Sequence, residues 1–244
     1  QPSWTFVLRP IETEMGVAMS LRFLAVLALG MASTAAAQES YKLEKLAEPP
    51  PDALAPAVKE TLEAEGRRVL DAKGAPLVDV WLRKAAPAAR TPAGSKGAVL
   101  YPVLTAGELI GAVRYAAEAY DYRDQTIAPG VYTLRYGLQP VDGDHLGVSV
   151  NRDYALLLPA DHDADAANLP PKSMHEHSAE AVGSTHPGVL MLLAAPAEPP
   201  ADGMVHDETL NTWGAVLKLP LQVEGEAAPV PLPLQLVVVG AKMD

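Results

Sequence analysis

The strongest constraint on the fold is the alternation of residue types from Val131 to Leu138, in the middle of the chain. In an extended chain, one set of alternating side chains would share a face: Tyr132, Leu134, Tyr136 and Leu138. A period of two is typical of a strand with one buried face. Pro129 and Gly130 favour a turn before this strand, and Pro140 favours its end because proline has no backbone N–H to donate. We expect this face to lie in the core, with these neighbours: Leu156, Leu158, Val189 and Leu236.

Short apolar or alternating runs, separated by turns rich in glycine and proline, recur along most of the chain. We expect strands at residues 67–71, 76–83, 98–104, 108–115, 130–139, 154–159, 189–194, 212–223 and 232–239, with a break at Pro220. One short helix is expected from Pro56 to Glu65, because proline suits a first helical turn and Gly66 can end the helix. The pattern predicts an all-β protein, an antiparallel β-sandwich of the immunoglobulin or prealbumin type with one short N-terminal helix.

A small barrel is the alternative to the sandwich. The sandwich is favoured because several prolines require a sheet edge or a bulge, which open sheets provide. These prolines are Pro76, Pro102, Pro220 and Pro233.

The N-terminal region has the composition of a secretory signal peptide. Arg22 precedes an apolar run at residues 23–32, and small residues follow at 35–37. The run is too short to span a bilayer, so we expect cleavage and no membrane span in the mature chain. Residues 1–37 are therefore interpreted as leader and signal peptide, with translation starting at Met19 or Met15 and the mature chain at Gln38. The expected location is periplasmic or secreted.

Two further segments complete the expected organisation of the chain. Residues 38–66 should form a polar tether and the short helix, because Pro49 to Pro51 favour an extended spacer. Residues 67–244 should form the β-sandwich domain.

Composition excludes several classes of function. The chain has no cysteine, which excludes disulfides, thiolate metal ligands and cysteine nucleophiles. A net charge of −11 and a pI near 5.0 argue against nucleic acid and anionic membranes as partners. The expected partner is a small molecule or a protein, whose identity the sequence does not indicate.

All six histidines fall between residues 145 and 206. His175 and His177 would lie on the same side of an extended segment, a spacing that can chelate Zn²⁺ or Cu²⁺. His186 or His162, in the same polar segment at residues 160–187, would supply a third ligand. The simpler interpretation is a solvated polar loop, because no zinc motif of established spacing is matched. No other cofactor is indicated.

A second concentration of polar residues lies between the strands expected at 130–139 and 154–159. Its candidate ligand-binding residues are Asp142, Asp144, His145, Arg152 and Asp153. Turn chemistry offers another explanation, because aspartate side chains in turns commonly accept hydrogen bonds from nearby backbone amides.

Four segments carry a resemblance to known proteins: VLDAKGAPLVDVWLRK, IAPGVYTLRYGLQPVDGDHLGV, NRDYALLLP and STHPGVLML. Together they resemble a family of exported proteins from environmental bacteria. The resemblance implies an exported all-β domain without an assigned activity, and it supplies no catalytic residues. The APGVYTL strand is also similar to strands of prealbumin-like sandwich modules.

Standard catalytic motifs are absent from the sequence. There is no GxGxxG, P-loop or HExxH motif, and the aspartates at 161–165 lack the glycine and glutamate of a calcium loop. The first hypothesis is therefore an exported, non-catalytic β-sandwich that binds a ligand or a partner. The second is a periplasmic protein that binds zinc or copper through the loop histidines. The third is a hydrolase that acts through aspartate and histidine in the two polar loops.

Overall fold

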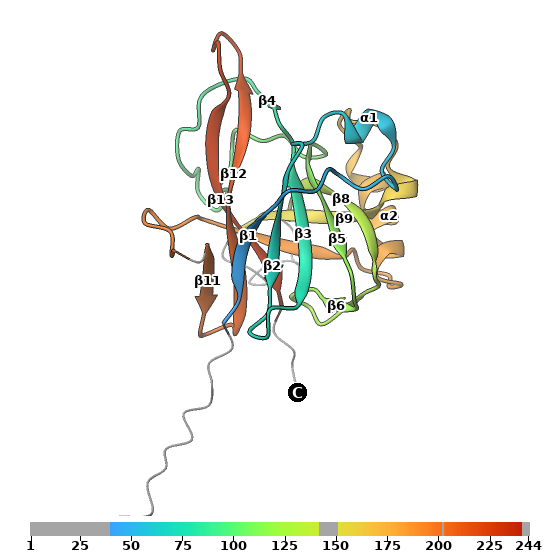
Figure 1. Ribbon diagram of the computed structural model, residues 1–244. Helices are drawn as coiled ribbons and strands as arrows, with labels where there is room; N and C mark the ends of the chain where they lie inside the picture. Colours follow the sequence, from blue (N-terminus) through green and yellow to red (C-terminus); the bar gives the residue numbers. More distant parts are fainter. Residues whose placement is uncertain (1–39, 142–150, 202, 241–244) are drawn as a thin grey trace, which may run out of the picture. The chain divides into compact units, whose positions relative to one another are not determined.

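The computed structural model describes residues 40–141, 151–201 and 203–240 (Figure 1). The expected signal peptide, leader and cleavage site all lie outside the described residues. None of the helices in the described part of the chain has the length and hydropathy that crossing a lipid bilayer requires.

Most of the described chain belongs to one large curled sheet of eleven strands (Figure 1). The order across the sheet is β1 (Lys42–Leu46), β2 (Gly66–Leu70), β3 (Pro76–Leu82), β5 (Leu109–Tyr115), β8 (Gly130–Leu138), β9 (Asp153–Pro159), β10 (Val189–Leu193), β13 (Val230–Val239), β12 (Thr212–Val223) and β11 (Met204–Asp207). β4 (Ala86–Ala88) adds to β12 in parallel, whereas the other strand pairs among the described residues are antiparallel. β6 (Ala119–Tyr120) and β7 (Thr126–Ile127) form a separate small sheet.

This sheet corrects part of the fold prediction. The protein is mostly β, as expected, but the sheet is mixed and a sandwich of two antiparallel sheets is not confirmed. β10 explains the difference, because residues 189–191 pair with β9 while residues 192–193 pair with β13. The two ends of one strand therefore join the two halves of the sheet. Side chains of β3, β5 and β8 share a single core with those of β12 and β13, so the sheet curls around that core.

β8 confirms the expected buried face and corrects its neighbours. Three of its alternating side chains, Tyr132, Leu134 and Tyr136, are buried in the main core together with Leu236, and Leu138 packs against that core. The other expected neighbours face the opposite side, in a separate cluster of Leu156, Leu158, Val189 and Met174.

The register between β8 and β9 accounts for this error. It places Leu157 opposite Leu134 and Leu158 opposite Thr133, so alternate leucines point to opposite faces of the sheet. Thr133 and Arg135, on the second face of β8, are also fully buried. The strand is therefore buried on both faces, not on one as predicted.

The segment before residue 67 belongs to the fold and is not a tether. β1 pairs along its whole length with β2, and residues 39–244 form one compact unit. The expected helix is shorter than predicted, because α1 spans only Pro56–Lys59. Leu54, Val58 and Leu62 nevertheless pack with Trp81 in a second buried cluster, on the outer face of β3. Apolar side chains thus hold this N-terminal segment against the sheet.

Helix α2 (Pro171–Ala181) lies in the segment that was predicted to be a polar loop. Pro171 occupies the first turn, and Met174, Ser178 and Ala181 form a buried stripe at helical spacing. A short 3₁₀ helix, η1 (Ala160–His162), follows directly after β9. The expected strand at 98–104 is instead formed by turns, and Pro220 does not interrupt β12.

Candidate functional site

Helix α2 and η1 bring two histidines and a glutamate together. His177 and Glu180 are three residues apart, which places them on the same face of α2. His162 ends η1 and reaches the same face. His162 Nδ1 lies 2.6 Å from Glu180 Oε2, and His177 Nδ1 lies 3.5 Å from the same oxygen. The two imidazole rings meet edge to face, with their centroids 5.2 Å apart.

The donor atoms of this cluster are close enough for a metal ion. One ligand atom from each of the three residues lies within 4.8 Å of the other two. Tetrahedral zinc with bonds of about 2.0–2.2 Å holds its ligand atoms about 3.3 Å apart, so small side-chain rotations would suffice. The side chains of His162, His177 and Glu180 are 40%, 35% and 54% exposed, which leaves them accessible to ions and free to rotate.

An additional carboxylate stands behind one ligand. Asp161 Oδ2 lies 3.8 Å from His162 Nε2, the ring nitrogen that does not face Glu180. A carboxylate that accepts a hydrogen bond from this ring nitrogen commonly orients a histidine ligand and fixes its tautomer, and Asp161 would have to approach more closely than 3.8 Å to do so. Three protein ligands would leave one position of a tetrahedral metal open, as in catalytic and exchangeable sites.

The structure separates the histidine pair that the sequence suggested. His175 and His177 lie on a helix, not on an extended segment, so residues two apart point to different faces. His175 Nε2 lies 3.1 Å from the hydroxyl of Tyr154 on β9. His186 follows α2 and is exposed, with its Nδ1 3.3 Å from Thr185 Oγ1. Of the four predicted histidines, only His162 and His177 come together, and Glu180 was missed.

The second group of predicted site residues has a structural role where it is described. Asp142, Asp144 and His145 lie outside the described residues. Arg152 donates from Nε to the carbonyl of Gln139 at 2.7 Å. Asp153 is buried and accepts hydrogen bonds from the backbone N–H groups of Leu100 and Tyr101 and from the hydroxyl of Tyr136.

Asp153 therefore anchors the turns at residues 98–104 to the end of β9. Burial, together with the hydrogen bond to Asp153, raises the pKa of Tyr136, so its hydroxyl remains a donor. Both oxygens of the Asp153 carboxylate accept hydrogen bonds from groups within the protein.

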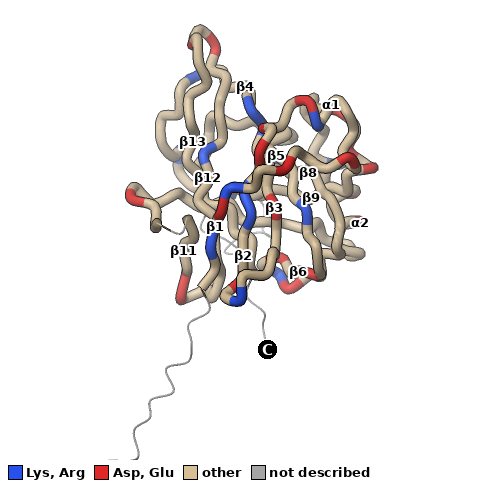
Figure 2. Tube along the Cα trace, in the orientation of Figure 1, with Lys and Arg blue, Asp and Glu red and all other residues tan. Residues whose placement is uncertain are grey.

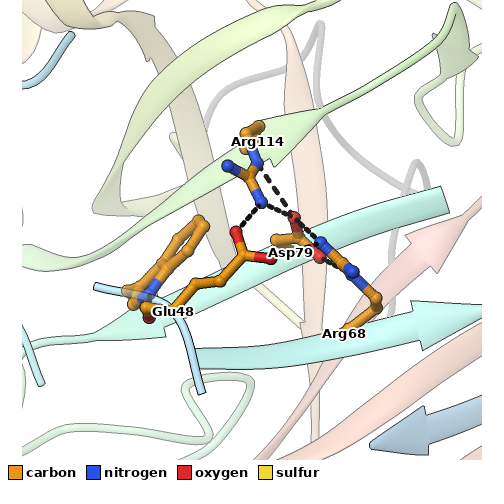
Figure 3. Close-up of polar contacts among 5 residues, drawn as sticks. Glu48, Arg68, Asp79 and Arg114 are labelled. Carbon is orange, nitrogen blue, oxygen red and sulfur yellow. Dashed lines mark hydrogen bonds and ion pairs between the residues drawn. The ribbon is translucent and has the colours of Figure 1, made fainter. Parts of the chain in front are cut away.

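A network of four charges covers the outer face of β2, β3 and β5 (Figure 3). Asp79 lies between two arginines: it accepts from Arg68 at 2.6 and 3.0 Å and from Arg114 at 2.6 and 2.9 Å. Glu48, from the segment after β1, accepts from Arg114 at 2.7 Å. Figure 2 shows charged residues of both signs on the neighbouring strands β1, β2 and β3.

This network fastens the segment after β1 to the sheet. Trp81 donates from Nε1 to the carbonyl of Glu48 at 3.0 Å, and the Arg114 guanidinium lies 5.3 Å from the centre of the Trp81 ring. Hydrogen bonding to Asp79 raises the pKa of Arg68, because it favours the charged guanidinium. Two positive and two negative charges satisfy one another, so the network is structural.

Comparison of the chain with protein-family models, with curated proteins and with solved structures found no match.

Proposed function

We propose that this protein is an exported, non-catalytic binding protein that takes up a divalent transition metal, zinc or copper, at His162, His177 and Glu180. The observation that carries the proposal is the convergence of two imidazole Nδ1 atoms on one carboxylate oxygen. Imidazole and carboxylate are ligands that zinc and copper accept, and two histidines with one carboxylate form a common set.

The energetics favour exchangeable rather than permanent binding. All three side chains are partly exposed, and the surrounding helix is held by its own buried stripe, so the fold does not require the metal. A metal would replace the close contact between His162 and Glu180 by stronger bonds to both. The fourth position would remain open to water or to a ligand from a partner.

A hydrolase that uses the two polar loops receives less support. Asp153 is the only acidic candidate of the first loop that the structure describes, and its carboxylate is committed to the backbone of residues 100 and 101 and to Tyr136. A general base must reach a substrate proton, and a buried and fully bonded carboxylate cannot do so.

Calorimetric titration of Zn²⁺ into the purified protein tests the metal proposal. We expect one ion per chain. His177→Ala should lower the affinity for Zn²⁺ at least tenfold. Loss of a group that only hydrogen-bonds to a metal ligand already lowers metal affinity by roughly 10–100-fold, and loss of a ligand itself should cost no less. Affinity should also fall on acidification, because protons compete for the imidazole nitrogens. His186→Ala is the matched control, since this exposed histidine lies outside the cluster and should leave the affinity unchanged. Equal heats from the wild type and His177→Ala would contradict the proposal.

Export is a separate part of the proposal and has its own test. It is supported by Arg22, the apolar run at 23–32 and the alanines at 35–37. N-terminal sequencing of protein recovered outside the cytoplasm should give a chain that starts at or near Gln38. Recovery of that protein with an intact Met19 would show that the segment is not a cleaved signal.

A further inference from the structure

A hollow of about 760 Å³ lies at the end of β4, away from the histidine cluster. Its walls come from three stretches that are distant in sequence: residues 87–90, 102–105 and 222–225, joined by Asn168. The volume falls within the range of about 300–1,000 Å³ that is typical of small-molecule sites. Pro87, Pro102 and Val103 give the hollow apolar surface, and one buried acidic residue, Glu108, lies in its wall.

Local geometry fixes the position of Glu108 at the start of β5. Gly107, just before it, has a φ of +93°, and a side-chain carbon at that position would lie 2.2 Å from the carbonyl oxygen of Leu169. Only glycine tolerates this conformation and this close approach. The backbone of Glu108 is bonded on both sides, to Thr105 and to Tyr136. The carboxyl group is therefore held in the wall by the chain itself.

One oxygen of this carboxyl group has no partner. Glu108 is 1% exposed, and its Oε2 accepts a hydrogen bond from the Thr105 N–H at 3.1 Å. Its Oε1 is buried and has no hydrogen-bond partner among the described residues. Buried carboxylates in proteins are almost always paired, because an unsatisfied buried acceptor is costly.

The other buried acidic side chains of the described chain make Glu108 an exception. Asp79, Asp121, Asp153 and Asp163 each use both carboxylate oxygens in hydrogen bonds within the protein. Both oxygens of each of these four carboxylates therefore have hydrogen-bond donors within the protein. Glu108 lines the hollow, and its unpaired oxygen is a buried acceptor that no donor among the described residues satisfies.

The charges near the hollow indicate which ligand fits. Burial raises the pKa of Glu108, while the Thr105 N–H and the positive field of Arg83 lower it. Arg83 Nη1 donates to the carbonyl of Leu109 at 3.4 Å, and no donor of Arg83 is within hydrogen-bonding geometry of the free oxygen. At the exposed rim, Glu224 adds a second acidic group and Arg90 one basic group. Among the lining residues themselves two are acidic and one is basic, and Glu108 provides an acceptor that lacks a donor.

We propose that this hollow binds a small organic cation, whose ammonium N–H group donates a hydrogen bond to the Glu108 carboxylate. The apolar stem of such a ligand would lie against the proline and valine side chains of the walls. The ammonium would compensate the buried carboxylate, as the arginines do for Asp79 and Asp163. This site is independent of the histidine cluster and of any metal bound there.

An NMR titration of the ¹⁵N-labelled full chain, with a chelator present, tests this proposal with two matched probes. Butylammonium should give saturable shifts in the amide signals of Thr105, Glu108 and Asn168, whereas butanol, of similar size and without charge, should not. Glu108→Gln preserves the shape and should weaken binding by about tenfold or more, because a charge-assisted hydrogen bond is lost. Glu63→Gln is the control, since Glu63 is another partly buried glutamate that lines a separate, smaller hollow.

A second variant keeps the test decisive if Glu108→Gln fails to fold. Ala89 is exposed and lines the hollow, so Ala89→Trp should block entry without disturbing the core. Loss of the butylammonium shifts in this variant supports the site. Equal chemical-shift responses to butylammonium and butanol would refute the proposal that the ligand is a cation. No saturable response to butylammonium, or unchanged binding by Glu108→Gln or Ala89→Trp, would overturn the site.

Discussion

The buried ion pair between Arg135 and Asp163 offers a demanding test of this structure, because both side chains are completely shielded from solvent. Asp163 accepts from the guanidinium of Arg135 at 2.6 and 2.8 Å and from the hydroxyl of Thr133. The guanidinium also donates to three backbone carbonyls, those of Gly107, Asp165 and Ala167. One side chain on β8 thereby holds the segment between η1, which ends at His162, and α2, which contains Glu180.

Arg135→Met keeps an unbranched side chain but removes every donor. It leaves a buried carboxylate with only the Thr133 hydroxyl, and it leaves three carbonyls without their guanidinium partner. Removal of one partner from a buried pair typically costs about 3–5 kcal/mol of unfolding free energy. Arg135→Met combined with Asp163→Leu should cost less than the sum of the two single changes, because neither charge is then buried alone.

Urea unfolding of the full chain, followed by tryptophan fluorescence and circular dichroism, measures these losses. The control is Lys172→Met, which breaks an exposed pair with Glu176 on α2 and should change stability by no more than about 0.5 kcal/mol. A loss below about 1 kcal/mol for Arg135→Met, or fully additive single changes, would show that the pair is solvated and that the covering segment is placed wrongly.

Three further predictions follow from buried side chains. Leu134→Ala should cost about 2–5 kcal/mol in urea unfolding because Leu134 is 1% exposed, and a loss below about 1 kcal/mol would refute its placement. Asp79→Asn should destabilise the chain more than Glu48→Gln, because Asp79 joins two arginines at 5% exposure whereas Glu48 is 47% exposed; equal losses would contradict this order. Burial raises the pKa of Glu108, so the folded chain holds its proton more tightly than the unfolded chain. Stability should fall as pH rises from the ordinary glutamate pKa through the raised one, and Glu108→Gln should flatten this fall in unfolding measured against pH.

Strands were predictable where the signal is local. The alternation of β8 gave its length to within one residue and identified the buried face of Tyr132, Leu134 and Tyr136. The burial of its second face was not predictable from β8 itself. Arg135 resembles a solvent-facing residue until Asp163, 28 residues further along the chain, supplies its partner. A period of two shows that two faces differ, but it does not show that the more polar face is exposed.

The predicted pairing of His175 with His177 depends on an extended conformation that the structure does not show. The aspartates, prolines and polar residues of the segment from 160 to 187 favour a loop when the sequence is considered alone. The stripe of Met174, Ser178 and Ala181 was a helical signal that this interpretation passed over. On an extended chain His175 would pair with His177, whereas on a helix His177 pairs with Glu180. The same residues therefore give a different set of ligands once the period changes from two to 3.6.

Acidic residues show most directly why a site cannot be found from composition. Asp153 was a candidate ligand because it follows a polar turn, yet its partners at residues 100, 101 and 136 make it structural. Nothing in the sequence marks Glu108 as a site residue, because a glutamate directly before an apolar strand is usually exposed. The difference between the two carboxylates is whether distant segments of the chain supply hydrogen-bond donors for them. Whether such donors are near depends on the curl of the sheet, which brings residues 87–90 and 222–225 beside the turn at 102–105. Even with these segments together, one oxygen of Glu108 has no donor among the described residues.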